Sequence, residues 1–347
     1  MGLPTYSYLQ GVSVFVKFSA KYMQLLWALV FLAACGQPAT ENPDLLTTAR
    51  GGGADIDLNR AEAVFGGVRG TTSAAQKVIV ENTGTAPLVV RRLAVVGPHR
   101  NAFGVSPPQL PLTLAPGDSE SVNVRFAPGR RQVGALRAAL LVVSNDPDER
   151  RRVVGLYGLS ARGEQGSGEP SLQAIVRTLG YTVNVGRRGL ILGTRPAPIG
   201  HEVRAPLFQK AGPGPVTMTP VARYSPDDPL KYGAYTEKGT VRETVGTIAT
   251  GHEQTLYPAT TSGSRASFEP DGSPFGFFVG STSYASHKTY TQDALNTGPV
   301  AHAVRIYPLK NRRGQPLPNS YLLAFEPASN GDYQDYVFVV KNVKPSR

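Results

Sequence analysis

Residues 121–126 read Ser-Val-Asn-Val-Arg-Phe and give the clearest fold signal in the chain. Apolar Val122, Val124 and Phe126 alternate with polar residues, which is the period of a β-strand that has one face on a core and the other in water. The residues at 115–118, Ala-Pro-Gly-Asp, combine a proline that fixes φ with a glycine that allows positive φ. This stretch therefore predicts a half-buried antiparallel strand that is entered through a tight turn.

Similar short runs lie on both sides of this strand. Apolar β-type residues recur at 77–81, 88–96 and 140–143, and turn residues at 82–85 and 144–147 separate them. Regular spacing of short strands and turns predicts an antiparallel sandwich of roughly 100 residues. We place this domain at residues 55–163.

The same region resembles a known family. Residues 78–88 read V-I-V-E-N-T-G-T-A-P-L, and Ser-Asn-Asp-Pro at 144–147 and Leu-Tyr-Gly at 156–158 follow in the expected order. These motifs resemble those of ASH-type (abnormal spindle and hydin) immunoglobulin-like domains. The resemblance implies an immunoglobulin-like sandwich that acts as a spacer or a protein-binding module, although a sandwich fold alone hosts many roles.

Residues 1–34 are predicted to be an export signal. An unbroken apolar run at 25–35 follows Lys17 and Lys21 and ends in small residues. The run is typical of a signal peptide and is shorter than the roughly 20 residues that a membrane-spanning helix needs. Its end, Leu-Ala-Ala-Cys at 32–35, resembles the lipobox of bacterial lipoproteins, which implies removal of residues 1–34 and lipidation of Cys35.

Two alternatives for this region stay open. The apolar run could be a buried core helix, or an uncleaved anchor that also uses residues 12–16. Translation could start at Met1 or at Met23, and a start at Met23 would remove both lysines. Cys35 is the only cysteine, so the chain cannot form an internal disulfide, and lipidation gives this thiol a role.

The remaining chain divides at glycine-rich segments. Residues 35–54 predict a flexible tether and residues 164–168 a linker, because both are polar and rich in glycine. A short helix is expected with Pro170 in its first turn, Leu172, Ile175, Val176 and Leu179 on its buried face and Gly180 as its stop. Residues 181–186 then return to a strand pattern.

The second domain, residues 169–347, is also expected to be all-β. Candidate strands lie at 215–221, 265–268, 275–279, 302–307, 321–325 and 336–340. Proline-containing loops separate them, which favours a jelly-roll-like sandwich with one short helix.

An acidic turn near the C-terminus is the best candidate for a metal site. Glu326, Asn330, Asp332 and Asp335 place several oxygen atoms in one turn between two predicted strands, and calcium binds six to eight oxygens. The alternative is a turn in which these side chains bond to their own backbone. Calcium is the only cofactor that the sequence suggests.

The residues around this turn also resemble a known domain. Residues 268–278, 324–326 and 330–338 are similar to the core-strand entry and the closing "F-E-D … D-Y-N-D-V-V-F" motif of a poorly characterised domain of bacterial secreted and surface proteins. Pro327 and Gln334 depart from that motif. Such domains occur beside sugar-binding modules, and this association implies a binding role at the cell surface.

Tyrosines supply the candidate ligand-binding residues. Tyr232, Tyr235, Tyr284 and Tyr290 lie in polar, loop-like stretches and are expected to be exposed. Exposed aromatic faces can stack on sugar rings, so these four residues predict a carbohydrate-binding surface.

Charge and motifs exclude other classes of function. The formal charge of +11 favours anionic lipid or acidic polysaccharide as a neighbour, and no basic run is interleaved with aromatics as a nucleic-acid binder requires. The histidines at 99, 201, 252, 287 and 302 are not in H-E-x-x-H spacing, and G-x-S-x-G and P-loop motifs are missing. The chain is therefore not expected to be an enzyme.

Together these features predict a lipid-anchored protein of the cell envelope that faces the periplasm or the exterior. Its expected role is non-catalytic binding of a carbohydrate or cell-wall polymer by the C-terminal domain. The alternative is a structural or protein-interaction scaffold, whose partner is an envelope protein.

Overall fold

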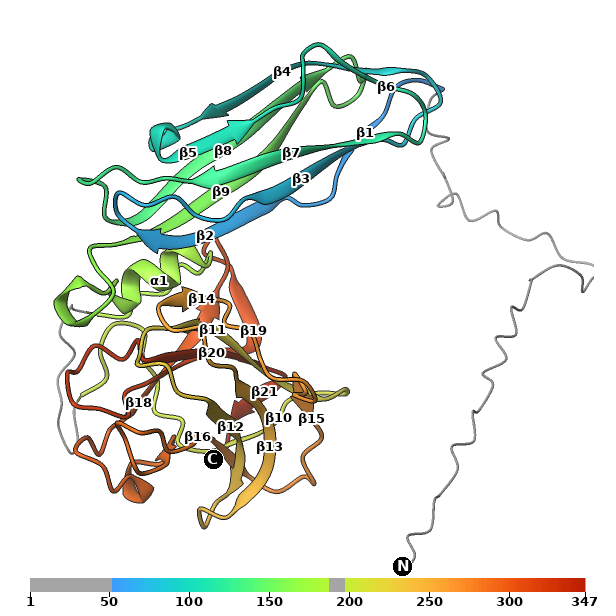
Figure 1. Ribbon diagram of the computed structural model, residues 1–347. Coiled ribbons are helices and arrows are strands. Elements are labelled where there is room, and N and C mark those ends of the chain that lie inside the picture. Colours follow the sequence, from blue (N-terminus) through green and yellow to red (C-terminus); the bar gives the residue numbers. More distant parts are fainter. Residues whose placement is uncertain (1–51, 187–196, 347) are drawn as a thin grey trace, which may run out of the picture. The chain divides into compact units, whose positions relative to one another are not determined.

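The computed structural model describes residues 52–186 and 197–346, and strands dominate this part of the chain (Figure 1). Its one α-helix is α1 (Leu172–Thr178), and three short 3-10 helices are η1 (Arg100–Ala102), η2 (Gly166–Gly168) and η3 (Asp293–Leu295). The predicted all-β class is confirmed. The apolar run at 25–35, the lipobox and Cys35 lie outside the described residues, and no described helix is long and apolar enough to cross a membrane.

Two sheets form the N-terminal sandwich. In spatial order, the four-stranded sheet consists of β1 (Ile56–Leu58), β3 (Gln76–Asn82), β7 (Ser119–Phe126) and β5 (Phe103–Ser106). The five-stranded sheet consists of β2 (Glu62–Val68), β9 (Arg151–Ala161), β8 (Gly134–Ser144), β4 (Leu88–Val96) and β6 (Leu112–Leu114). All neighbours are antiparallel except β2 and β9, which run parallel.

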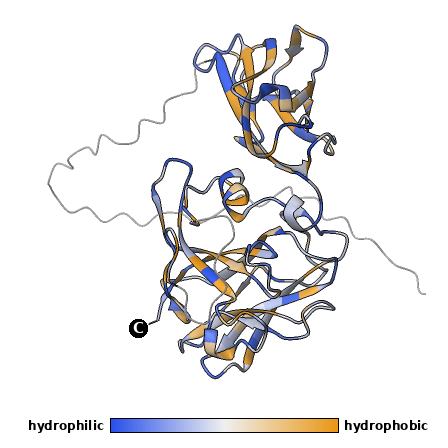
Figure 2. Cartoon of the chain, turned by 90° about the vertical axis from the view of Figure 1, so that its left-hand side faces the viewer, coloured by the Kyte–Doolittle hydropathy of each residue, from blue (hydrophilic) through white to orange (hydrophobic). Residues whose placement is uncertain are grey.

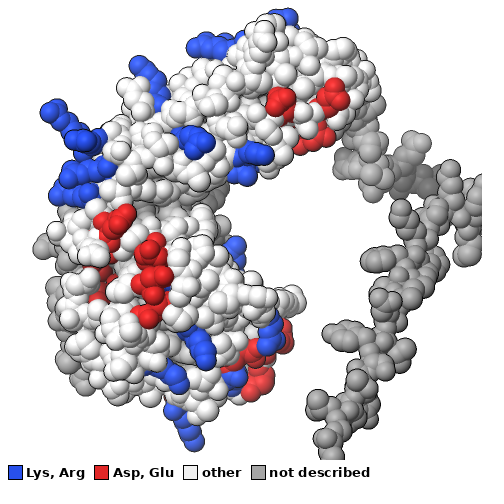
Figure 3. All heavy atoms as spheres, in the orientation of Figure 1, with Lys and Arg blue, Asp and Glu red and all other residues white. Residues whose placement is uncertain are grey.

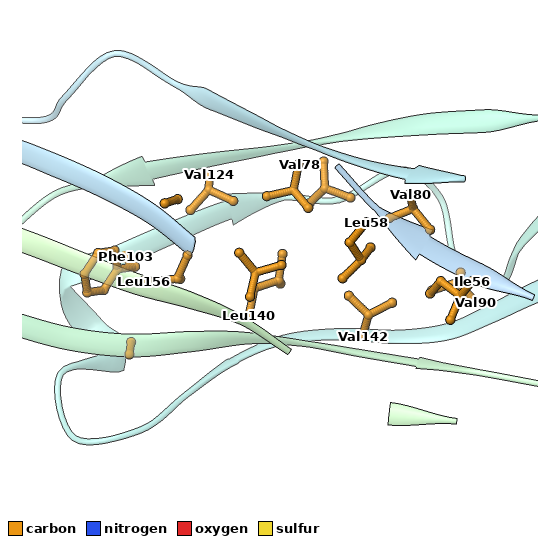
Figure 4. Packing of buried hydrophobic residues seen from close by; sticks show 14 of the residues in the cluster. Ile56, Leu58, Val78, Val80, Val90, Phe103, Val124, Leu140, Val142 and Leu156 are labelled. Carbon is orange, nitrogen blue, oxygen red and sulfur yellow. The ribbon is translucent and has the colours of Figure 1, made fainter. Parts of the chain in front are cut away.

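The core between these sheets follows the predicted alternation. Val122, Val124 and Phe126 of β7 are completely buried. In Figure 4 the aliphatic side chains of the two sheets point toward one another, with Val78 and Val124 opposite Leu140. Figure 2 shows the matching pattern along the chain, with apolar residues in the strands and polar residues in most connections.

Polar motif residues hold the turns of this sandwich. The buried Asn82 amide donates to the carbonyls of Ala86 and Leu114 at 2.9 and 3.0 Å, and its oxygen accepts from the Gly84 N–H. Asp146 accepts three backbone N–H groups, including that of Ile56 at 2.8 Å. Burial alone would raise the pKa of Asp146, but these backbone donors lower it.

Close packing of the two sheets explains why the Leu-Tyr-Gly motif at 156–158 ends in glycine. Gly158 of β9 lies against the Phe126 ring, so an added Cβ would clash with that ring. Phe126 is completely buried and also packs against Phe65 and Phe103, at ring-centroid distances of 6.3 and 5.1 Å. Position 158 therefore requires glycine for a steric reason.

We expect Gly158→Ala to lower the free energy of unfolding by about 1–3 kcal/mol, because the core is overpacked. Gly104→Ala is the matched control, since a Cβ on this β5 glycine would meet no atom within 4 Å. The control should change stability by less than about 0.5 kcal/mol in urea unfolding. Equal effects of the two variants would show that crowding against Phe126 is not the cause.

The second sandwich also has two sheets. One consists of β13 (Val241–Ile248), β12 (Leu230–Thr236), β16 (Phe275–Val279), β10 (Phe208–Lys210) and β21 (Val343–Pro345), and β17 (Thr289–Tyr290) pairs with β16. The other consists of β14 (Thr255–Leu256), β11 (Val216–Arg223), β20 (Tyr336–Lys341), β19 (Pro316–Phe325) and β18 (Val304–Lys310), and β15 (Ser267–Phe268) pairs with β11.

Most expected elements of this sandwich are present, with three differences. Six strands lie in regions where no strand was expected, namely β10, β12, β13, β14, β17 and β21. Residues 181–186 are not a strand, although the Thr182 N–H donates to the carbonyl of Lys310. Helix α1 begins after Ser171, whose side chain accepts from the Ala174 N–H, so Pro170 lies before the helix and not in its first turn.

Helix α1 buries the predicted face. Leu172, Ile175 and Val176 are at most 2% exposed, and Gly180 ends the helix at a φ of +94°. The helix shares an apolar cluster with Leu159 of β9 and with residues of β11, β19 and β20. Residues 51–347 accordingly form one compact unit, and the expected boundary at 164–168 stays a prediction.

Candidate functional site

The predicted calcium turn lies between β19 and β20. Glu326 is completely buried, and its Oε2 accepts the backbone N–H groups of Asp332 and Tyr333, both at 3.0 Å. Exposed Asn330 accepts the Asp332 N–H through its side-chain oxygen at 3.2 Å. The turn therefore uses some of its polar side chains to bond its own backbone, as the alternative interpretation expected.

Residues from distant segments complete an acidic cluster, which we define as Glu169, Glu326, Asp332, Gln334 and Asp335. The Gln334 amide donates to Asp332 Oδ2 at 2.9 Å and to Glu169 Oε2 at 3.0 Å. Glu169, next to helix α1, lies 165 residues from Gln334 in the chain. The sequence analysis missed Glu169, because no local motif connects it to the turn.

Negative charge in the acidic cluster is poorly compensated. Burial, together with the neighbouring carboxylates, raises the pKa of Asp335 well above its usual value and that of Glu326 to about 7. Four buried oxygens have no hydrogen-bond partner among the described residues, namely Glu326 Oε1, Asp332 Oδ1, Gln334 Oε1 and Asp335 Oδ2. Buried carboxylates without partners must take up a proton or a cation.

Among the described residues, no three His, Cys, Asp or Glu side chains are arranged so that they could hold a metal ion. Glu169, Asn330 and Asp335 do line a cavity of about 990 Å³, which gives the cluster access to solutes. Calcium binding by Glu326, Asn330, Asp332 and Asp335 stays a prediction.

The calcium prediction has a direct thermal test. Because a divalent ion would neutralise the buried carboxylates, calcium should raise the melting temperature of chelator-treated protein, and Asp335→Asn should abolish the rise. Asp228→Asn, at an exposed carboxylate that bonds Ser283 outside the cluster, is the control and should keep it. An unchanged melting temperature in calcium would contradict the prediction.

Two of the four predicted ligand-binding tyrosines are buried, so the prediction that they belong to an exposed aromatic platform is wrong. Tyr232 and Tyr235 lie within β12 and are at most 1% exposed. Tyr232 packs on Phe338 at 4.9 Å between ring centroids, and the Tyr235 hydroxyl is within 3.1 Å of Thr291 Oγ1. These tyrosines support the core and cannot stack on a sugar.

The other two tyrosines are only partly buried. Tyr290 packs edge-on against Tyr235 at 4.9 Å between ring centroids, and Tyr284 donates a 3.0 Å hydrogen bond to the Tyr336 hydroxyl. No open aromatic platform joins Tyr284 and Tyr290 to the other pair, because Tyr232 and Tyr235 are inside the sandwich. A sugar-binding role for Tyr284 and Tyr290 stays a prediction.

A buried histidine network escaped the sequence analysis. His302 Nε2 lies 2.8 Å from Glu202 Oε1, and its Nδ1 lies 2.9 Å from Asp293 Oδ2. Arg305 pairs with the other oxygen of Glu202. The sequence gives no local signal for this network, because Glu202 and His302 are 100 residues apart.

The network engages both ring nitrogens of His302 with carboxylates. Ionised carboxylates only accept hydrogen bonds, so both ring nitrogens of His302 donate, as in an imidazolium, whenever Glu202 and Asp293 are both ionised. Burial alone would lower the pKa of His302, but the hydrogen bonds and charges of Asp293 and Glu202 raise it. Neither ring nitrogen is free to take a proton from a nucleophile, as a catalytic triad requires.

His302 should make stability depend on pH. Because its pKa is raised by folding, the stabilisation is complete below the unfolded value of about 6.5 and is lost as pH rises through the folded value. We expect the unfolding free energy of His302→Gln to fall less steeply than that of the wild type as the pH rises above about 6.5, measured by urea unfolding at a series of pH values. His252→Gln, at a histidine outside the network, should keep the slope, and a slope unchanged in both variants would contradict this role for His302.

The third feature is an apolar surface on the N-terminal sandwich. Inward residues of β8 and β9, such as Leu140 and Val154, are completely buried, yet their outward neighbours are apolar as well. We call three cross-strand rows of β4, β8 and β9 the outer face: Arg92–Val143–Arg151, Ala94–Leu141–Val153 and Val96–Ala139–Gly155. Val153 is 54% exposed, one of the few large apolar side chains so exposed in the described part.

Arginines border this outer face. Arg92 and Arg151 lie in its first row, and Arg137 lies beyond its third row, opposite Tyr157. All three are exposed, and β4, β8 and β9 contain no acidic residue. Figure 3 shows Lys and Arg side chains spread over the N-terminal sandwich, with acidic side chains in smaller groups. The sequence analysis recorded the apolar runs at 88–96 and 140–143 but did not assign their faces.

Comparisons with known proteins agree with the fold of this sandwich. Residues 54–158 match the family model described as HYDIN/CFA65/VesB-like, Ig-like domain. The match confirms the Ig-like ASH-type domain that the motifs predicted. No curated protein matches the chain.

Solved structures give only distant similarities. The ASH/PapD-like domain 7 of human CEP192 is 17% identical and has a TM-score of 0.25, over 40% of this chain and all of that domain. The secreted serine protease VesC of Vibrio cholerae is 11% identical with a TM-score of 0.28, over 85% of this chain and 51% of the protease. A protein of unknown function from Porphyromonas gingivalis W83 is 18% identical with a TM-score of 0.25, over 30% of this chain and 46% of that protein. The chain thus spans about half the length of the last two relatives.

Proposed function

We propose that this chain is a non-catalytic protein-binding protein of the cell envelope, anchored by a lipid on Cys35. Its outer face on β4, β8 and β9 is the docking surface in this proposal. Ig-like domains of the matched type are typically non-catalytic, which is consistent with a binding role.

The outer face is the observation that supports the proposal most directly. An antiparallel sheet with one face in water normally alternates apolar and polar residues, whereas the outward residues of β8 between Arg137 and the end of the strand are apolar as well. In this surface Val153 is exposed and its apolar neighbours Leu141 and Ala94 are half-buried. Contiguous apolar surface that solvent reaches marks interaction sites in soluble proteins. Val153, Leu141 and Ala94 form its centre, and each is the cross-strand partner of the next.

A carbohydrate ligand has less support than the sequence suggested. Tyr232 and Tyr235 are buried, and the three rows contain no side-chain amide or carboxylate that could hydrogen-bond a sugar. The Tyr157 ring lies against Gly155 of the third row, but the Arg312 guanidinium already stacks on it. A protein surface with apolar side chains fits the outer face better. Binding of a cell-wall polymer becomes an alternative outcome of the test.

The test places a photo-crosslinking amino acid at position 153 of the full chain in the cells that make it. A discrete protein adduct should form in the membrane fraction, and Cys35→Ala should move both the chain and the adduct into the soluble fraction. The crosslinker at Val133, which is 38% exposed in a loop outside the outer face, is the matched control and should give no such adduct. Proteins contact a docking surface at its centre, so position 153 should react first.

Affinity for the captured protein provides the second part of the test. Val153→Asp should weaken its binding by at least about tenfold, because a charge would be buried in an apolar contact, and Val133→Asp should not. Both variants should melt within a few degrees of the wild type, since both positions are exposed. A missing adduct, or equal binding by both variants, would overturn the proposal.

A further inference from the structure

We propose that the partner of the outer face is a protein surface with an aliphatic centre and acidic residues at its border, and not a second copy of this chain. This inference rests on the proposed function and specifies the chemistry of the partner. It is carried by the contrast between the apolar rows of the outer face and the arginines around them.

The arginines are available for a partner. Arg92 and Arg151 flank Val143 in one row, and among the described residues no carboxylate pairs with either guanidinium. Arg152, the neighbour of Arg151, is instead engaged by Glu149 and by Asp57 at 3.8 Å. The sandwich therefore neutralises an arginine at one position and leaves the two at the outer face exposed.

Charge opposes self-association through this surface. Arg92 and Arg151 lie at one end of the outer face and Arg137 at the other, and these strands carry no acidic residue. A twofold dimer through this face would bring guanidinium groups of both copies together around the apolar centre. Like charges placed across an interface cost several kcal/mol, so a partner with carboxylates is favoured over a second copy.

The composition of the outer face also distinguishes a protein from a membrane. Surfaces that enter the lipid interface use Trp, Tyr or Phe beside Leu, together with basic residues. The three rows contain only Ala, Val, Leu, Gly and the two arginines. Short aliphatic side chains on a flat sheet suit packing against another sheet or helix, as within the cores of layered proteins.

The closing experiment measures binding of the full chain, purified in detergent, to defined probes. The probes are a glutamate–leucine random copolymer, poly-L-glutamate, and vesicles of phosphatidylglycerol. We expect the copolymer, which has both acidic and aliphatic groups, to bind at least about tenfold more tightly than poly-L-glutamate and than the vesicles.

Two arginine variants separate the outer face from general charge. Arg92→Gln with Arg151→Gln should weaken copolymer binding at least about fivefold and reduce its salt dependence. Arg130→Gln with Arg131→Gln removes the same charge from the exposed loop before β8 and should change binding by less than about twofold. Equal losses in the two double variants would overturn the inference, as would tighter binding to vesicles or self-association in sedimentation.

Val153→Asp distinguishes the failure of this inference from failure of the proposed function. Loss of copolymer binding in Val153→Asp without loss in the Arg92 and Arg151 variant would reject the acidic partner and keep the docking surface. Copolymer binding that none of these variants changes would reject both.

Discussion

The five-stranded sheet of the N-terminal sandwich has apolar residues on both faces at the centre of β4, β8 and β9, and this constraint links the fold to the proposed function. One face is covered by the four-stranded sheet, against which Leu140 and Val142 pack. At one end, the opposite face approaches helix α1 and the cluster that contains Leu159. The outer face of β4, β8 and β9 is the part that no described element covers fully, so it is the part left for a partner.

Local sequence patterns predicted the N-terminal sandwich well, because its core follows a period of two. The alternation lies within β7 itself. Asn82 and Asp146 each accept a backbone N–H group from a nearby residue of their own turn. By contrast, Tyr232 and Tyr235 lie in a strand that is buried on nearly all positions, so no alternation exists to reveal it. Polar residues on both sides of β12 made it resemble a loop.

The candidate sites were harder to predict, because their residues come from distant parts of the chain. The acidic residues of the 326–335 turn are visible in the sequence, but their link to Glu169 depends on how helix α1 packs. Glu202 and His302 are brought together only by the second sandwich. A long-range pair of this kind has no spacing signature, and only the fold defines it.

The second sandwich contains two networks of buried carboxylates, and only one of them has cationic partners. Glu202 is compensated by the charges of His302 and Arg305, and although burial would raise its pKa, these partners lower it. No described cation compensates Glu326 and Asp335 in the same way, and their pKa values rise. A compensated network locks one arrangement, whereas an uncompensated one responds to protons or cations from solution. The acidic cluster is therefore the part of the second sandwich that is most sensitive to its surroundings, while the outer face supplies the docking surface of the first.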